Sequence, residues 1–336
     1  MSQTTPGTRP SRPRPWDGVR QWWSGLTPVS GSLVMATGIC SIGLHAVGHE
    51  TLSRFALGLA GLAWLLLAVL FLRRFLLERG RWRHDADTPA SLTAIAATCV
   101  LGSRLSLQSW QFPAAVLLVT AAVLWPVLLV AVVKHWGRHM PGAVFLSCVA
   151  TQALVVLGSL LAAATRTTWL TWPALVLWGT GLVLYLAALP RFDLRYPFTG
   201  AGDQWIAGGA PAVSALAAAQ LAAAPGTVGS LRVVPLAGGV LLGVAAAWYL
   251  FMVAAEILRP RPRYHTRRWA TVFPMGMTAV ATLNLARPLR APWLQDAGRV
   301  LLWLAIAAWL LVFAQLIHHW TARDCVPTPP QRASGC

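Results

Sequence analysis

Charged residues are scarce in this sequence. Only 11% of its 336 residues are Asp, Glu, Lys or Arg, whereas 56% are hydrophobic. An ordinary soluble domain has about 25% charged residues, so this composition excludes that class. The mean hydropathy of +0.59 points the same way. We therefore expect the chain to reside in a lipid bilayer.

The sequence also lacks the short motifs of common enzymes and ATP-driven pumps. It contains no GxSxG, HExxH, phosphate-binding loop or dinucleotide fingerprint. Its five cysteines show no paired or metal-type spacing. His45 with His49, and His135 with His139, have the i, i+4 spacing of metal ligands, but third and fourth ligands are missing. We expect no catalytic residue, no metal and no cofactor.

Acidic residues are the rarer of the two charged kinds. The chain has 10 Asp and Glu against 27 Lys and Arg, which gives a formal net charge of +17. Such a charge could indicate nucleic-acid binding. The basic residues, however, lie in short clusters between long apolar runs rather than along one polar face. This pattern is typical of membrane loops, and we expect no nucleic-acid partner.

Apolar runs long enough to span a membrane follow one another along the chain. A spanning helix needs about 20 mostly apolar residues. The predicted spans are 28–48, 53–76, 90–108, 113–134, 141–164, 169–190, 205–224, 232–258, 269–287 and 297–320. Residues 1–27 and 321–336 are expected to be tails.

The distribution of arginine and lysine predicts the orientation of these spans. With the N-terminus inside, 20 basic residues lie on the cytoplasmic side and 6 on the outer side, while Arg104 falls within a span. Cytoplasmic loops carry the excess of positive charge in membrane proteins. We therefore expect a multi-pass protein of the inner (plasma) membrane with both termini in the cytoplasm.

The predicted spans alternate between two kinds. Even-numbered spans are bulky and rich in Leu, Val and Trp, whereas odd-numbered spans, such as 31–43 and 147–159, are smaller and more polar. Small residues mark close helix contacts or a pore lining in membranes. Pro211 and Pro274 lie within odd spans, where a kink serves either packing or a water-filled cavity. An inner ring of odd helices inside an outer ring of even ones is the expected arrangement.

Five segments on alternate spans resemble a known family, the tellurite-resistance/dicarboxylate transporters, which include plant slow anion channels and their bacterial homologues. The segments are 34-VMATGICSIG-43, 98-TCVLGSRL-105, 150-ATQALVVL-157, 203-DQWIAGGAPAVSAL-216 and 269-WATVFPMGMTAVAT-282. They occur in the family's order. The resemblance implies an all-α polytopic membrane protein with about ten transmembrane helices, arranged as five hairpins around a central pore, and a homotrimer.

The resemblance also implies candidate site residues. A phenylalanine of the ninth helix closes the pore in this family, and the matching residue is Phe273 within 272-VFPMG-276. Packing alone is the other interpretation of this side chain. The candidate pore-lining residues are Thr37, Gly38, Gln152, Gly209, Pro211, Pro274 and Gly276. The polar ones could instead form hydrogen bonds between helices.

Arg104 is a charged residue near the outer end of the third predicted span, 90–108. A charge in the middle of a membrane costs about 2.5–3.5 kcal/mol on insertion scales. Its side chain is expected either to reach the lipid headgroups or to attract anions to the outer mouth of the pore.

Two functions remain open from the sequence. The first is a passive channel for small inorganic or organic anions. The alternative is a secondary transporter, possibly proton-coupled, for C4-dicarboxylates, sulfite or tellurium oxyanions. Neither function is expected to make the chain an enzyme.

Overall fold

The computed structural model describes residues 30–80, 86–226, 231–260 and 265–324. The predicted tails, 1–27 and 321–336, lie outside these ranges except for residues 321–324, which continue the last helix. The described residues form helices and no strand, apart from one isolated bridge between Met140 and Phe192. The predicted all-α class is therefore confirmed.

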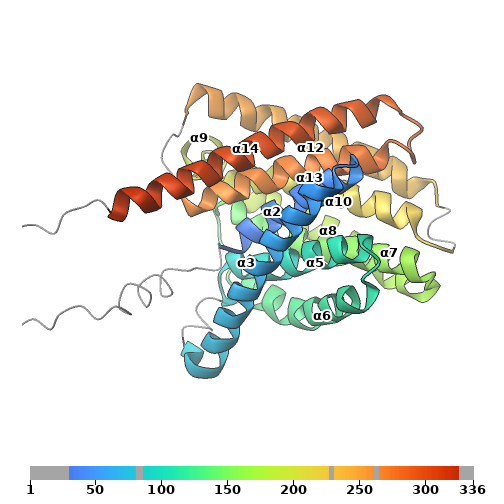
Figure 1. Ribbon diagram of the computed structural model, residues 1–336, viewed down its shortest axis with the longest axis horizontal. Coiled ribbons are helices and arrows are strands. Elements are labelled where there is room, and N and C mark those ends of the chain that lie inside the picture. The colour runs from blue at the N-terminus through green and yellow to red at the C-terminus, as the bar shows by residue number, and fades with distance from the viewer. Residues whose placement is uncertain (1–29, 81–85, 227–230, 261–264, 325–336) are drawn as a thin grey trace, which may run out of the picture.

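Ten helices of at least 16 residues follow one another in the described ranges (Figure 1). They are α2 (Gly31–Ala46), α3 (Glu50–Leu77), α5 (Leu92–Leu107), α6 (Gln111–Lys134), α7 (Leu146–Thr165), α8 (Thr171–Ala188), α10 (Ile206–Ala223), α12 (Val233–Leu258), α13 (Trp269–Leu285) and α14 (Trp293–Asp324). Short helical segments flank several of them: η2 (Pro89–Ser91), η3 (Gly142–Phe145), η4 (Thr168–Leu170), η5 (Leu189–Arg191), α9 (Tyr196–Thr199), η6 (Asp203–Trp205) and η7 (Thr266–Arg268). Each long helix corresponds to one predicted span.

Eight of the described helices are long and apolar enough to cross a membrane. They are the helical stretches that contain α3, α5, α6, α7, α8, α10, α12 and α14. The protein is thus a polytopic membrane protein. α2 is a shorter apolar helix of 16 residues, about 24 Å long at 1.5 Å per residue. That is less than the roughly 30 Å of a bilayer core, so a count of ten spans stays a prediction.

Burial separates the long helices into two classes, as the sequence predicts. Within an apolar window of 18 residues in each spanning stretch, 78%, 94% and 83% of the residues are buried for α5, α7 and α10. In the corresponding windows of α3, α6, α8, α12 and α14 the buried share is only 11% to 22%. α2 and α13 join the buried class, with 13 of 16 and 15 of 17 residues buried. The helices rich in small residues therefore lie in the interior of the protein, and the helices rich in bulky residues lie on its outside.

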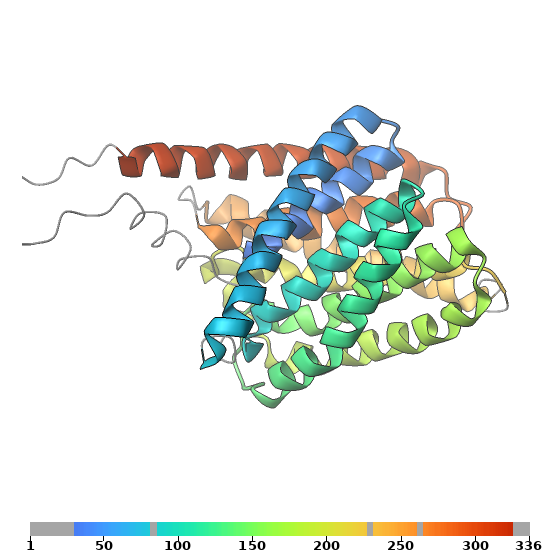
Figure 2. The same cartoon turned by 60° about the horizontal axis from the view of Figure 1, so that its bottom comes forward.

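The five buried helices form a closed ring. In order around the ring, α2 contacts α5, α5 contacts α7, α7 contacts α10, α10 contacts α13, and α13 returns to α2. Each also packs against the outer helix that follows it in the chain, which gives the hairpins α2–α3, α5–α6, α7–α8, α10–α12 and α13–α14. Figure 2 shows several of these long helices running side by side.

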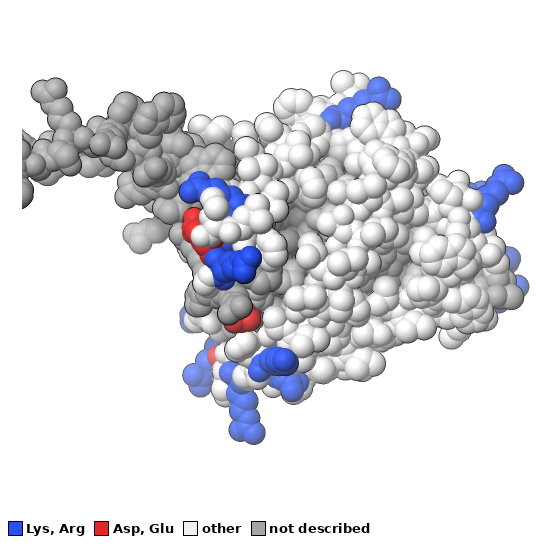
Figure 3. Space-filling model, turned by 90° about the horizontal axis from the view of Figure 1, so that it is seen from below, with Lys and Arg blue, Asp and Glu red and all other residues white. Residues whose placement is uncertain are grey.

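The outer surface fits a bilayer. In Figure 3 most of the Lys, Arg, Asp and Glu side chains on the visible face lie toward the two ends of the molecule, and uncharged surface lies between them. Large apolar side chains such as Leu72, Val123 and Val240 are exposed on the outer helices. In water this surface would be costly, but in lipid it is the favourable one.

Candidate functional site

Four outer helices are each tied by a tryptophan to the inner helix of the next hairpin. The indole N–H bonds are Trp64 to Thr98 Oγ1 (2.9 Å), Trp125 to Thr151 Oγ1 (2.9 Å), Trp178 to the Ser214 carbonyl oxygen (3.0 Å) and Trp309 to Thr37 Oγ1 (3.0 Å). We call these four bonds the tryptophan clasps. An indole N–H left without an acceptor in hydrocarbon is costly. The clasps therefore fix which face of each inner helix points outward.

The fifth position of this pattern differs. On α13 the matching hydroxyl is Thr278, which donates to the Pro274 carbonyl oxygen four residues earlier at 2.8 Å. The residues at 98, 151 and 214 make the same bond within their own helices. Trp248 of α12, however, donates to the Tyr185 hydroxyl of α8 at 3.2 Å. α13 thus departs from the arrangement of the other four inner helices.

A narrow crevice lies where the fifth clasp would be. Its empty space is about 170 Å³, and it is too narrow to admit a water molecule. Its walls are Trp205, Gly208, Ala245, Trp248, Tyr249, Met252, Pro274 and Thr278. The crevice therefore separates α12 from the part of α13 that contains its proline.

Phe273 lies five residues before Thr278. Five residues of an α-helix turn by roughly 140° beyond one full rotation, so this position lies on the side of the helix opposite the outward-facing hydroxyl. The same step on the other inner helices leads to Ser32, Thr93, Leu146 and Gly209. All five positions are buried, and Phe273 is 2% exposed. Helix geometry thus aligns Phe273 in register with three small residues and one leucine of the other inner helices.

The interior of the ring is filled by side chains. Every residue is buried over 34–44 of α2, 95–104 of α5, 146–159 of α7 and 206–219 of α10. A continuous water-filled passage would leave a stripe of exposed residues along these helices. These stretches therefore line no continuous water-filled passage in the structure.

The predicted glycines lie where inner helices meet. A Cβ added at Gly38 would come within 2.6 Å of Val100 on α5, and one at Gly276 within 2.7 Å of Ile39 on α2. A Cβ at Gly209 would come within 2.9 Å of the Pro274 ring on α13. Each glycine therefore permits the close approach of two neighbouring inner helices. A role of these residues in lining a pore stays a prediction, as it does for the buried Pro211.

Two predicted pore-lining side chains form hydrogen bonds with outer helices. The Thr37 hydroxyl accepts the clasp from Trp309 on α14. The Gln152 side-chain amide donates to the Trp178 carbonyl oxygen of α8 at 3.0 Å, and the same side chain packs against Gly181. Both helices α8 and α14 belong to the outer ring. These contacts fit the hydrogen-bonding interpretation, and a role of the two residues in lining a pore stays a prediction.

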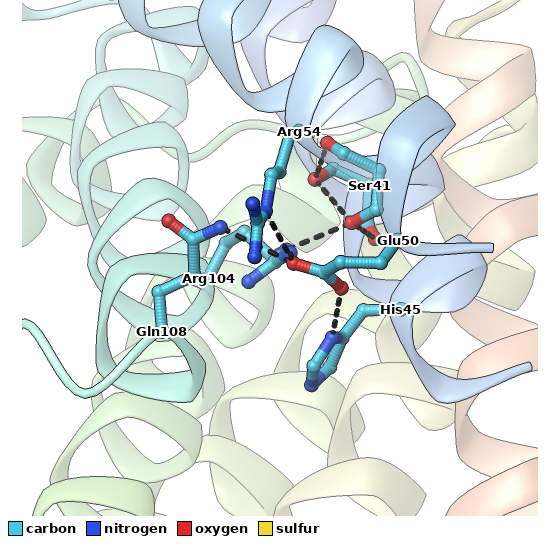
Figure 4. A network of polar contacts seen from close by, with 7 residues as sticks. Ser41, His45, Glu50, Arg54, Arg104 and Gln108 are labelled. Atoms are coloured by element: carbon cyan, nitrogen blue, oxygen red, sulfur yellow. Dashed lines mark hydrogen bonds and ion pairs between the residues drawn. The ribbon is translucent and has the colours of Figure 1, made fainter. Parts of the chain in front are cut away.

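Arg104 forms a buried ion pair. Its side chain is fully buried, its Nη2 lies 3.0 Å from Glu50 Oε1, and its Nε donates to the Ser53 hydroxyl at 2.9 Å. Figure 4 shows Arg54 and Gln108 reaching the same Glu50 carboxylate, while His45 contacts its other oxygen. The guanidinium thus stays inside the protein and does not extend to the headgroups. Glu50 compensates its charge, and attraction of anions by Arg104 stays a prediction.

Other polar side chains of the membrane helices also find partners within the protein. Glu256 of α12 contacts Arg268 at 2.6 Å. The Gln220 amide donates to the side-chain oxygen of Asn284 at 3.0 Å and joins α10 to α13. Within the described ranges, no three His, Cys, Asp or Glu side chains gather as a metal site.

The sequence carries only a weak signal of the tryptophan clasps. Alanine precedes the hydroxyl residue at 36–37, 97–98 and 150–151, and valine precedes it at 213–214. A tryptophan lies in the middle of each following outer helix. This signal comprises only one or two residues per helix. It can be interpreted only once the structure shows that the indole of each clasp tryptophan bonds the neighbouring hairpin rather than its own.

Comparison with known proteins agrees with this architecture. The family model for the voltage-dependent anion channel matches residues 25–317. Two uncharacterized membrane proteins, from two strains of Mycobacterium tuberculosis, are each 29% identical over 154 residues, which cover 41% of this chain and 72% of each relative. The family match includes all ten long helices except the last residues of α14. The chain belongs to the voltage-dependent anion channel family.

Proposed function

We propose that this protein is an anion channel whose passage follows the axis of the inner ring and is closed by Phe273. The observation that carries the proposal is the position of this side chain. It is the one aromatic residue at a level where the other inner helices have Ser32, Thr93, Leu146 and Gly209. A bulky apolar ring at such a constriction blocks ions by excluding water.

The surroundings of α13 support a gate at this helix. The clasps hold α2, α5, α7 and α10 to outer helices, whereas Trp248 is bonded to Tyr185 instead of α13. Pro274 directly follows Phe273 and has no backbone N–H to donate. The narrow crevice between α12 and α13 makes the packing beside this proline incomplete, so a small tilt of α13 toward α12 would close it. Movement of α13 into that space would withdraw the ring from the axis.

The composition of the inner helices favours passage without a strong binding site. Arg104 is the one Lys, Arg, Asp or Glu in the five inner helices, and it is paired with Glu50. Ions that cross a neutral, narrow passage are selected by the cost of dehydration and by backbone and hydroxyl dipoles. Weak binding permits fast release.

The assembly and orientation are part of the same proposal. We place the protein as a homotrimer in the plasma membrane with both termini in the cytoplasm, and with small anions as its substrates. The excess of basic residues on the N-terminal side of the predicted topology supports the orientation. The resemblance to slow anion channels supports the trimer.

Reconstitution in planar bilayers tests the channel and its gate together. We expect Phe273→Ala to raise the anion conductance at least tenfold, because alanine leaves the constriction unfilled. Phe145→Ala is the matched control, since Phe145 is also fully buried but packs against Tyr185 and Phe192 away from the ring axis. Both variants lose about 3–5 kcal/mol of packing, so their folding is compared first.

The same recordings separate the two candidate functions. Reversal potentials that follow the Nernst potential of the anion indicate a channel. A reversal potential that moves with an imposed pH gradient would indicate the proton-coupled transporter instead. An unchanged current in well-folded Phe273→Ala protein would contradict the gate.

A further inference from the structure

A large groove lies on the outside of the molecule between α3, α5 and α6. Its volume is about 1250 Å³. Most of its surface is apolar, with side chains that include Leu57, Leu65, Leu101, Leu105, Val116 and Leu117. The groove is therefore separate from the ring interior in which we place the anion passage.

The groove is open because two glycines lie along its wall on α3. Gly58 and Gly61 line it, and a Cβ added at either would meet no atom within 4 Å. Within an apolar window of 18 residues, only 11% of α3 and 22% of α6 are buried, so both helices face the bilayer. Hydrocarbon is thus the solvent at the apolar part of this groove.

One end of the groove is polar and carries excess positive charge. His45, Glu50, Arg54 and Gln108 line this end. Arg54 and the buried Arg104 both contact the single Glu50 carboxylate, each at 3.0 Å, which leaves one positive charge uncompensated within this cluster when His45 is neutral (Figure 4). The Arg54 side chain remains 69% exposed.

Aromatic residues follow directly after this polar end. Trp110 and Phe112 line the groove and are 57% and 80% exposed. Tryptophan is enriched where a membrane protein meets the headgroup layer. The Glu50 end of α3 therefore lies at a membrane interface, and the apolar part of the groove extends from it along the acyl chains.

We propose that this groove binds one anionic phospholipid, with an acyl chain along Gly58 and Gly61 and the phosphate at Arg54. The charge at the polar end matches a phosphate, and the apolar walls match an acyl chain. The site occupies the leaflet at the Glu50 end of α3. The proposal does not depend on the anion channel function.

Native mass spectrometry of the full-length protein tests this site. Detergent-solubilised protein is mixed with equal amounts of dioleoyl phosphatidylglycerol and dioleoyl phosphatidylcholine, and the lipids retained are counted. Arg54→Gln removes the charge, and Gly61→Leu or Gly58→Leu fills the groove. Arg166→Gln and Gly179→Leu are the controls, because Arg166 is an exposed arginine at the end of α7 and Gly179 is a glycine of α8 with the same free space around it.

The wild type and both controls are expected to retain phosphatidylglycerol about fivefold more than phosphatidylcholine, the effect of one arginine near anionic lipid. Arg54→Gln should reduce this ratio to about one, and the two leucine variants should lose the retained lipid of both kinds. Equal retention of the two lipids by the wild type would overturn the proposal. An unchanged ratio of phosphatidylglycerol to phosphatidylcholine in Arg54→Gln, or retention of lipid by both leucine variants, would overturn it as well. A lower oligomeric state in the leucine variants with unchanged lipid would show that a second copy of the chain occupies the groove.

Discussion

Replacing each clasp threonine by valine tests whether the tryptophan clasps stabilise the ring. Valine keeps the shape of threonine and removes the hydroxyl. In Thr98→Val the N–H of Trp64 loses its acceptor at a place where water cannot replace it. We expect the free energy of unfolding to fall by about 1 kcal/mol, and by less than about 2 kcal/mol, since hydrogen bonds between membrane helices average about 0.6 kcal/mol with a maximum near 1.7.

Thr278→Val is the internal control for this series. Thr98 and Thr278 both donate to the carbonyl oxygen four residues earlier in their own helix, so both variants lose that bond. Only Thr98 also accepts from a tryptophan, because Trp248 is bonded to Tyr185. The difference between the two variants therefore measures the clasp itself.

The assay is reversible unfolding in mixed micelles as the fraction of denaturing detergent is increased. A double-mutant cycle of Trp64→Phe with Thr98→Val isolates the pair, because removal of both partners leaves no unpaired N–H. We expect a coupling energy of about 0.6–1.7 kcal/mol. A coupling energy near zero, or an equal loss in Thr278→Val and Thr98→Val, would refute the assignment of a structural role to the clasps.

Three further predictions concern the gate, the ring and the buried ion pair. Ala245→Leu fills the crevice beside α13 and should reduce the open probability in single-channel recordings, while on the Phe273→Ala background it should leave the current unchanged. Gly276→Val should cost about 1–3 kcal/mol in the same unfolding assay, because its side chain would press α13 away from α2. Arg104→Gln should cost about 2 kcal/mol, since Glu50 loses a buried partner but is itself partly exposed. Because Glu50 compensates the charge of Arg104, the ratio of currents at low and high salt should change less than twofold; a fall confined to low salt would instead support attraction of anions by Arg104.

The sequence by itself determined the class of protein and the order of its helices. An apolar run such as 113–134 has no stable place in water, and its length matches a bilayer, so composition alone predicts a spanning helix there. When η3 is counted as part of α7, both ends of each of the ten long helices lie within four residues of the ends of the predicted span. The contrast between small and bulky helices also predicted which of them are buried, because only small residues permit close approach in lipid.

Only the tertiary structure decided which way each buried side chain points. Gln152 lies on a helix that is apolar on nearly every side, so no polar face in the sequence shows whether it turns to the ring axis or to α8. Trp248 has the same kind of sequence surroundings as Trp64, yet it bonds Tyr185 in the preceding hairpin, whereas Trp64 bonds the following one. Arg104 finds Glu50, which lies 54 residues earlier in the chain. These pairings depend on helix rotation and on packing between distant segments, and a uniformly apolar pattern leaves both undetermined.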